Sequence, residues 1–300
     1  MRRATDSARE PKPFGRKSTG IRIRRSARAT AAATASAVAT LACSPAFSAT
    51  PAQARFQVVG DWGYGSSAQQ TIAERMCERQ RSRPVDFILT TGDNFYRPNG
   101  TATDTNFHQP QACLIEAGTR WRAAWGNHDL GGTSTAEVLG ASSRWYRFRA
   151  GPAIVVVLDA NLPTDANQLA FMRRAIPNAW PGPVIVAFHQ PLRSGGLHRP
   201  SRVQQAAWEP LLRARRVDLI LQGHNHAYER LLVGGIRHIT TGGGGAPLYP
   251  CLYPVAGLER CEVVFHFLEV TVTPRALDVA VIDADGNRID RVRVAVKRSE

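Results

Sequence analysis

Residues 85–96 read Val-Asp-Phe-Ile-Leu-Thr-Thr-Gly-Asp-Asn-Phe-Tyr, an apolar run that stops at a glycine followed by an acidic residue. The run is short and contains several β-branched side chains, which predicts a buried strand over Val85–Thr91. Gly92 permits the sharp turn and the close backbone approach that place Asp93 at the end of this strand. The segment therefore predicts a core strand whose carboxyl end presents a metal-ligand type of side chain.

The same pattern recurs at four other apolar runs, which end at Asp61, Asn127-His128, His189 and His224-Asn225-His226. A single Asp or His in such a place is usually a turn, a helix cap or a structural residue. Five strand ends of this kind are harder to explain separately. Because ligand sites in open α/β sheets form outside the carboxyl ends of the strands, we expect these side chains to share one site.

Apolar runs alternate with helical patterns along the rest of the chain, which indicates an α/β architecture in layers. Three further runs near the C-terminus look like consecutive antiparallel strands that complete a second sheet packed against the first, the last two joined by a turn at residues 284–287. The expected core strands are Phe56–Gly60, Val85–Thr91, Trp121–Trp125, Ala153–Leu158, Val184–Phe188, Val217–Gln222 and Ile236–Thr240. The expected C-terminal strands are Val263–Val272, Ala276–Ile282 and Arg288–Val296, and the expected helices are Ala68–Gln80, Gln168–Ile176 and Arg202–Arg213.

The first 54 residues are typical of a leader segment. A basic stretch precedes a bland apolar run, Ala29–Cys43, which is too short for a stable membrane anchor, and Ala52-Gln53-Ala54 fits a cleavage site. We expect residues 1–54 to be a signal peptide and residues 55–300 to be the catalytic domain of a secreted or periplasmic protein. A disordered basic arm is the alternative. Arg24-Arg25 leaves the export route open between the general and the twin-arginine pathways.

The net charge of the mature chain is modest. The whole chain has 38 Lys and Arg and 24 Asp and Glu, but residues 1–28 hold ten of the bases and two of the acids, which leaves a net charge of +6. This charge suits an anionic small molecule, and the sequence has no dense basic stripe of the kind that binds nucleic acid.

Four cysteines remain after the leader, an even number that favours disulfides in an exported chain. Three pairings are possible. Proximity in the sequence favours Cys251 with Cys261, which leaves Cys77 with Cys113. None of the four has the C-x-x-C spacing of a thiolate metal site.

The five strand ends, taken in order, resemble the five metal-binding motifs of the purple acid phosphatases, a family within the calcineurin-like metallophosphoesterases. The motifs are Asp61-Trp62-Gly63, Gly92-Asp93-Asn94-Phe95-Tyr96, Gly126-Asn127-His128-Asp129, Val186-Ala187-Phe188-His189 and Gly223-His224-Asn225-His226. The resemblance extends from about Arg55 to Gly245. It implies a two-sheet mixed β-sandwich flanked by α-helices, in the small form without an N-terminal sandwich domain, as a monomer or weak dimer.

The resemblance also implies a dinuclear metal centre. Asp61, Tyr96 and His226 would hold the first metal, Asn127, His189 and His224 the second, and Asp93 would bridge them. Oxygen and imidazole donors of this kind suit iron, zinc or manganese.

Tyr96 makes the resemblance specific to the purple acid phosphatases within the metallophosphoesterases. Most metallophosphoesterases have Asp-x-His in the first motif, whereas Gly63 stands here in place of that histidine, and Tyr96 would supply the missing ligand. A phenolate favours a trivalent ion, so the resemblance implies Fe(III) at the first site and Fe(II), Zn or Mn at the second. A trivalent ion keeps hydroxide available at mildly acidic pH.

Two histidines remain for the substrate. His128 follows the ligand Asn127, and we expect it to bind phosphate and stabilise the transition state, with Asp129 orienting its imidazole. His198 lies nine residues after His189, where the resembling mammalian enzymes have a second substrate-facing histidine; a solvated loop histidine is the alternative. Either His128 or His198 could protonate the leaving alkoxide.

The resulting hypothesis is an acid phosphatase that hydrolyses phosphate monoesters with a metal-bound hydroxide and without a phosphoenzyme. The alternatives are an exported phosphodiesterase or nucleotide hydrolase of the same superfamily, and a non-catalytic phosphate-binding protein. Relative rates on monoesters and diesters distinguish the first alternative, and phosphate binding without turnover distinguishes the second.

Overall fold

The computed structural model describes residues 52–96 and 99–296. These residues fall within the unit Ser48–Glu300. The predicted signal peptide lies outside the described residues except for its last three positions, and β1 begins at Ala54. Within these ranges no helix is long and apolar enough to cross a bilayer.

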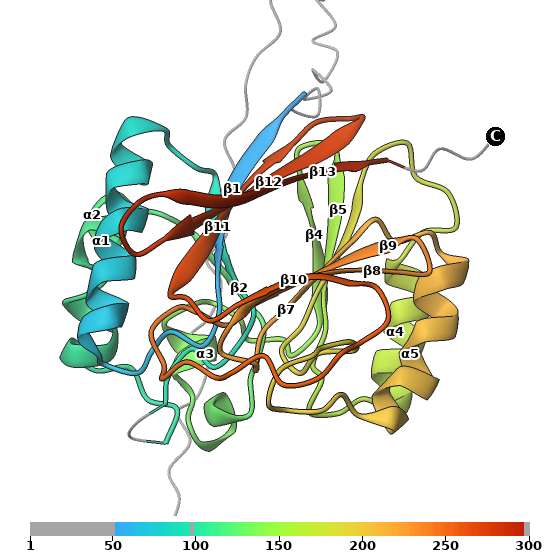
Figure 1. The fold of residues 1–300 in the computed structure, drawn as a ribbon, viewed down its shortest axis with the longest axis horizontal. Coiled ribbons are helices and arrows are strands. Elements are labelled where there is room, and N and C mark those ends of the chain that lie inside the picture. The colour runs from blue at the N-terminus through green and yellow to red at the C-terminus, as the bar shows by residue number, and fades with distance from the viewer. Residues whose placement is uncertain (1–51, 97–98, 297–300) are drawn as a thin grey trace, which may run out of the picture. The chain divides into compact units, whose positions relative to one another are not determined.

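Two β-sheets pack face to face and carry helices on their outer faces (Figure 1). Sheet A has the strand order β13-β12-β11-β1-β2-β3, in which β1, β2 and β3 are parallel and β11, β12 and β13 continue antiparallel. Its strands are β1 (Ala54–Val59), β2 (Phe87–Thr90), β3 (Trp121–Ala123), β11 (His266–Val272), β12 (Ala276–Asp283) and β13 (Arg288–Ala295).

Sheet B has the order β10-β8-β9-β7-β6-β5-β4, with a parallel centre of β9, β7, β6 and β5 and antiparallel strands on both sides. Its strands are β4 (Tyr146–Ala150), β5 (Ala153–Val157), β6 (Val184–Ala187), β7 (Leu219–Gln222), β8 (Tyr228–Val233), β9 (Ile236–Thr241) and β10 (Leu258–Glu262). The predicted two-sheet mixed sandwich is confirmed.

The helices lie on the two outer faces, with α1 and α2 against sheet A and α4 and α5 against sheet B (Figure 1). They are α1 (Ser67–Ser82), α2 (Ala112–Glu116), α3 (Ser134–Glu137), α4 (Ala166–Ala175) and α5 (Arg202–Ala214), with a π-turn at Asp104–His108 and a 3-10 turn at His128–Gly131. Ser66, Asp165 and Ser201 cap α1, α4 and α5 by accepting a backbone N–H three residues later.

The core follows from strand alternation. In β5, Val155 and Val157 point into the space between the sheets, whereas Ile154 and Val156 point toward α4 and α5. Strands that are apolar on both faces therefore hold three apolar layers together. These layers keep the carboxyl ends of the parallel strands of both sheets on one side of the molecule.

Both predicted disulfides are present. Cys77–Cys113 joins α1 to α2, and Cys251–Cys261 closes the loop that precedes β10. The predicted turn between the last two strands is also confirmed, since Asp283 donates its backbone N–H to the carbonyl of Asn287 and Gly286 has φ 86°.

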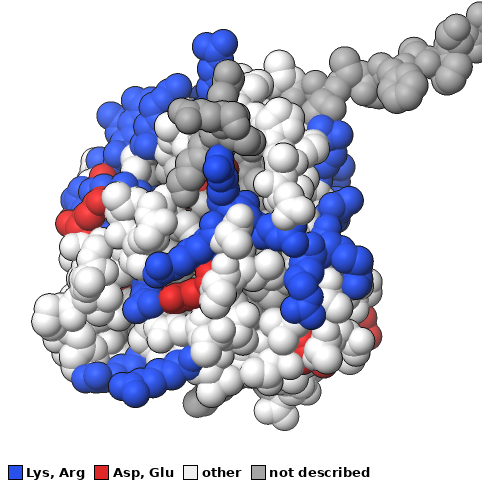
Figure 2. All heavy atoms as spheres, turned by 90° about the vertical axis from the view of Figure 1, so that its right-hand side faces the viewer, with Lys and Arg blue, Asp and Glu red and all other residues white. Residues whose placement is uncertain are grey.

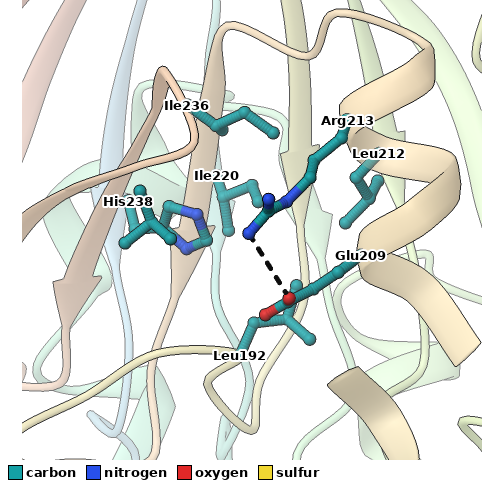
Figure 3. A pocket seen from close by; sticks show the side chains of 8 residues that line it. Leu192, Glu209, Leu212, Arg213, Ile220, Ile236 and His238 are labelled. Carbon is teal, nitrogen blue, oxygen red and sulfur yellow. Dashed lines mark ion pairs between the residues drawn. The ribbon is translucent and has the colours of Figure 1, made fainter. Parts of the chain in front are cut away.

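A small cavity of 10 Å³, about the space of one water, lies between α5 and sheet B. Figure 3 shows His238 of β9 facing the guanidinium of Arg213, which pairs with Glu209 at 3.8 Å. His238 is buried, and its Nδ1 has no hydrogen-bond partner among the described residues. Burial, followed by repulsion from Arg193 and Arg213, lowers the pKa of this imidazole to about 3.

Candidate metal centre

Five strand ends converge at the edge where the two sheets meet. Sheet A supplies side chains that follow β1, β2 and β3, and sheet B supplies side chains that follow β6 and β7. The structure brings together all seven side chains that the sequence predicted as metal ligands: Asp61, Asp93, Tyr96, Asn127, His189, His224 and His226.

The first group of side chains surrounds Asp61. Its Oδ1 lies 3.3 Å from Nε2 of His226 and 3.4 Å from the hydroxyl of Tyr96. The Tyr96 hydroxyl in turn lies 3.1 Å from the same His226 nitrogen. A carboxylate, a phenol and an imidazole therefore direct their donor atoms at one point in the interior.

The second group surrounds His189, which is fully buried. Its Nε2 lies 3.1 Å from Oδ1 of Asn127 and 3.2 Å from both Nδ1 of His224 and Oδ2 of Asp93. Burial, followed by repulsion from His189 and His198, lowers the pKa of His224 to about 2, so this ring is neutral. A neutral imidazole is the form that binds a metal.

Asp93 belongs to both groups. Two sets of side chains have ligand atoms close enough to hold one ion each, Asp93 with His189 and His224, and Asp61 with Asp93 and His226. A carboxylate common to two adjacent sets is the arrangement that bridges two metals.

The electrostatics of the cluster fit a bound cation. Burial, then repulsion from Asp61 and Asp93, raises the pKa of Tyr96 well above its ordinary value. A phenol held beside two buried carboxylates is unfavourable to ionise on its own, and a metal ion reverses that balance. The donor set and its surplus of buried acid therefore fit metal ions of the iron, zinc or manganese type.

The backbone is strained at three of these residues. Asp61, Asp93 and His224 have φ of 56°, 49° and 70°, in the left-handed region that non-glycine residues rarely adopt. Such strain persists where the surrounding structure fixes it, and it concentrates at functional sites. Only two other non-glycine residues in the described ranges have positive φ.

Two glycines allow the motifs to approach one another. A Cβ on Gly126 would lie 2.1 Å from Oδ1 of Asp93, and a Cβ on Gly63 would lie 1.7 Å from the carbonyl oxygen of Asn94. No side chain fits at Gly63, which explains why Tyr96 and not a residue at position 63 reaches the centre.

Backbone carbonyls orient two of the imidazoles, a feature that the sequence does not reveal. His189 Nδ1 donates to the carbonyl of Thr91 at 2.9 Å, and His226 Nδ1 donates to the carbonyl of Pro247 at 2.6 Å. Each bond fixes the orientation of the ring and directs Nε2 into the centre, as second-sphere partners of metal-binding histidines commonly do.

Asp129 does not have the role predicted for it, which was to orient the imidazole of His128. Its fully buried carboxylate accepts the backbone N–H groups of Gly126 and Asn94 at 2.7 and 2.9 Å, and the side-chain amide of Asn94 at 2.9 Å. It also accepts from the N–H of Phe95. The 3-10 turn at 128–131 directs Asp129 inward and His128 outward, so Asp129 fixes the loops that carry Asp93, Tyr96 and Asn127 and does not orient the His128 ring.

His128 lies at the mouth of the centre. Its side chain is 48% exposed, its Nε2 is 4.0 Å from Oδ2 of Asp93, and its ring centroid is 4.4 Å from that of Tyr96. Its backbone N–H donates to Asp93 Oδ1 at 2.9 Å. The imidazole is therefore anchored by its backbone and open to solvent beside the predicted bridging carboxylate.

His198 also reaches the centre. Its ring centroid lies 4.3 Å from that of His224 and 5.2 Å from that of Tyr249. The Asn225 side chain holds the backbone of His198 on both sides, since Oδ1 accepts its N–H at 2.7 Å and Nδ2 donates to its carbonyl at 2.9 Å. This loop histidine is thus fixed against the neighbouring ligand motif.

A buried glutamate supports this loop. Glu229 accepts from the Ser194 hydroxyl and the Gly195 N–H, both at 2.6 Å, and from Thr240 Oγ1 at 2.9 Å. Ser194 then accepts from Asn225 at 2.6 Å. The chain of bonds connects the strand after the last motif to the loop that carries His198.

Tyr249 was missed at the sequence level. Its ring stacks on His226 with centroids 3.9 Å apart and planes inclined by 11°. It lies in a glycine- and proline-rich stretch with no periodic signal, and only the fold brings it to the rim of the centre.

Comparison with known proteins agrees with this geometry. The sequence profile of the calcineurin-like phosphoesterase family matches residues 54–228. The chain is 28% identical over 237 residues to purple acid phosphatase 17 of Arabidopsis thaliana, covering 63% of this chain and 68% of that protein. It is 25% identical over 294 residues to tartrate-resistant acid phosphatase type 5 of Sus scrofa, covering 80% and 86%.

Two solved structures have a similar fold. Purple acid phosphatase PPD1 from yellow lupin seeds aligns with a TM-score of 0.70 and 17% identity, over 82% of this chain and 54% of that chain. GAP50, described as the anchor in the inner membrane complex of Plasmodium, aligns with a TM-score of 0.73 and 19% identity, over 83% and 90%.

Proposed function

Because this chain belongs to the calcineurin-like phosphoesterase family, we propose that it is an acid phosphatase that hydrolyses phosphate monoesters at a dinuclear metal centre. Phosphoester hydrolysis is the activity of the family and of the purple acid phosphatases it resembles. The observation that carries the finer proposal is the position of Asp93, which is common to two adjacent sets of ligand atoms.

The seven converging side chains would hold the metals. Asp61, Tyr96 and His226 would bind the first, the Fe(III) site, and Asp93 would bridge to the second. The second metal, Fe(II), Zn or Mn, would be bound by Asn127, His189 and His224. Bound metals would supply positive charge to the phosphoryl oxygens and activate water for attack.

The protein's own groups would bind and orient the phosphoester. His128, exposed at the mouth beside Asp93, would donate from its imidazole to a phosphoryl oxygen and stabilise the charge that develops there. His198, fixed by Asn225 beside His224, would face the leaving group. Either imidazole would protonate the departing alkoxide.

The first test is the visible absorption spectrum of the purified metal-loaded protein, with metal analysis, repeated for Tyr96→Phe. A broad charge-transfer band that disappears in the variant, together with monoesterase activity at acidic pH, is the expected result. A colourless protein that contains only divalent metals would contradict the Fe(III) assignment. Phosphate binding without turnover would contradict the catalytic proposal.

Two further measurements define the reaction. We expect inversion of configuration at a chiral phosphorus, since direct attack by water has one displacement, whereas retention would require a covalent phosphoenzyme. We also expect monoesters to react faster than diesters. The reverse order would favour a phosphodiesterase or nucleotide hydrolase of the same family.

The proposed working form is an exported domain, residues 55–300, that acts on a small phosphoester as a monomer or weak dimer and has no role in binding nucleic acid. Two disulfides support an oxidising compartment. The mass of the product recovered outside the cytoplasm tests the boundary, because cleavage after Ala54 would leave Arg55 as the first residue.

A further inference from the structure

A second pocket lies beside the candidate centre, on the far side of the loop that carries His198. Its volume is 300 Å³. The residues that define its character are Arg193, Arg199, Arg202, Tyr253, Pro254 and Val255. Its wall therefore combines three guanidinium groups with an aromatic ring and two apolar side chains.

Two of the three arginines are free to bind a ligand. Arg193 forms a two-bond ion pair with Glu209, at 2.7 and 2.8 Å, so its guanidinium already has a carboxylate partner. Within residues 52–96 and 99–296, neither Arg199 nor Arg202 pairs with a carboxylate; Arg199 instead lies over the ring of Tyr253, 4.1 Å from its centroid. No acidic residue lines the pocket, so it carries uncompensated positive charge.

The chemistry of these groups makes a phosphoryl group a suitable ligand for the pocket. Arg202 is the first residue of α5, a helix of 13 residues whose N-terminal N–H groups add to the positive field. Arginine presents a planar set of donors that matches the oxygens of phosphate. The face that carries α4 and α5 bears many cationic side chains (Figure 2), and since the described residues contain no lysine these are all arginines.

The pocket shares its wall with the centre. The ring centroid of His198 lies 4.3 Å from that of His224, while its neighbour Arg199 and the nearby Ser194 line the pocket. On the other side, the backbone N–H groups of Leu252 and Tyr253 both donate to the carbonyl of Gly195 at 2.8 Å. One pair of loops therefore separates the two sites, with His198 on the side of the centre and Arg199 on the side of the pocket.

We propose that this pocket binds a second phosphoryl group of the substrate, carried on the leaving-group side of the phosphoester that is hydrolysed. The proposal rests on the proposed function and names its substrate class, small molecules with two phosphoryl groups joined by a partly apolar spacer. Arg199 and Arg202 hold the second group, and Tyr253, Pro254 and Val255 contact the spacer.

A matched series of substrates tests the proposal with the metal-loaded enzyme. The α,ω-alkanediol bisphosphates with three to eight carbons are compared with the alkyl monophosphates of the same lengths, by phosphate release at acidic pH. The wild-type protein is expected to prefer the bisphosphate, in kcat/KM, by about tenfold or more at the spacer length that fits. Arg199→Gln and Arg202→Gln are each expected to reduce that preference by about tenfold, as expected for loss of one charge-assisted contact.

Arg215→Gln is the matched control, because Arg215 lies at the opposite end of the same helix and outside the pocket. It should leave the preference unchanged. Equal rates on both series at every length, or a preference that both pocket variants retain, would overturn the second-phosphoryl site while leaving the proposed function intact. Turnover of neither series by the metal-loaded enzyme would overturn the proposed function, and the pocket assignment with it.

Discussion

The buried imidazole of His238 is expected to make the fold less stable at the acidic pH at which the enzyme would work. Its pKa falls from the ordinary 6.5 to about 3, because burial and the charges of Arg193, Arg213 and Arg237 oppose protonation. The ring lies in the small cavity beside α5, and Glu209, which also lines that cavity, is itself engaged by Arg193. The folded protein therefore excludes a proton that the unfolded chain accepts.

The sign and size follow from proton linkage. Between pH 6.5 and about 3 the unfolded state binds one more proton at this site, so the free energy of unfolding decreases as the pH falls. From pH 7.5 to 4.5 the loss amounts to about 2.7 kcal/mol, a large part of the stability of an ordinary domain. His238→Phe removes both ring nitrogens and with them this loss. Because Nδ1 has no hydrogen-bond partner among the described residues, little is lost at neutral pH.

Chemical denaturation of the wild type and the variant at pH 7.5 and 4.5 measures the effect, taken as the difference between the two proteins so that contributions common to both cancel. The stability of His238→Phe relative to the wild type should rise by about 2.7 kcal/mol between the two pH values. Ile220→Val is the control, since it changes packing in the same cavity without a titrating group and should cost about 1 kcal/mol at both pH values. A relative stability of His238→Phe that does not change with pH would refute the reasoning.

Three further predictions concern the loops around the centre. Gly63→Ala should destabilise the fold and lower metal content, because its Cβ would overlap the carbonyl of Asn94; normal metal content and melting temperature would contradict this. Asp129→Asn replaces a carboxylate that accepts several N–H bonds by an amide that also donates. The substitution should lower the free energy of unfolding in denaturant by about 2–3 kcal/mol. It should also lower kcat for a monoester more than it changes KM. Replacing Cys77 and Cys113 by serine releases a loop of sequence separation 36 that spans the Asp93 motif, and should lower the free energy of unfolding by about 4 kcal/mol. The same replacement of Cys251 and Cys261, with separation 10, should lower it by about 3 kcal/mol. Equal losses in the two unfolding curves would contradict the loop-length argument.

Much of the fold could be predicted because its strands are continuous apolar runs. The expected helix Arg202–Arg213 differs from α5 by one residue, and the expected strand Ile236–Thr240 differs from β9 by one. Strand ends were extended in several places, as for Val217–Gln222 against β7 at Leu219–Gln222. Apolar residues continue past the last hydrogen bond between paired strands, and the sequence does not distinguish them from apolar residues within the strand.

Three strands were missed, each for a different reason. β10 is short and charged, and it is a strand because it pairs with β8. β8 itself follows the last histidine motif, and its charged start conceals the strand. β4 alternates Tyr146, Phe148 and Ala150 with arginines, a pattern of period two that was available in the sequence.

The candidate site was predictable to the extent that it depends on strand ends. Polar side chains after five apolar runs indicated one shared site, and the resemblance to the purple acid phosphatases supplied the set of seven ligands, including Tyr96. Asp129 was assigned the wrong partner because adjacency in the sequence says nothing about the 3-10 turn that separates it from His128. Tyr249 and the carbonyl of Pro247 could not be found, because their place at the centre depends on the path of an irregular segment.

The centre lies on the seam between the two sheets, and this position has a consequence for the lifetime of the protein. Each proposed metal takes ligands from both halves of the fold, Asp61 and Tyr96 with His226 for the first, and Asn127 with His189 and His224 for the second. Elsewhere the two sheets are joined by the apolar core between them and by Asp290 of β13, which pairs with Arg230 and Arg260 of sheet B. In a molecule without metal ions the two sheets would separate most easily at this interface, and such molecules would be cleaved by proteases before the metal-loaded ones. Metal supply would then determine how many copies survive as well as how fast each one works.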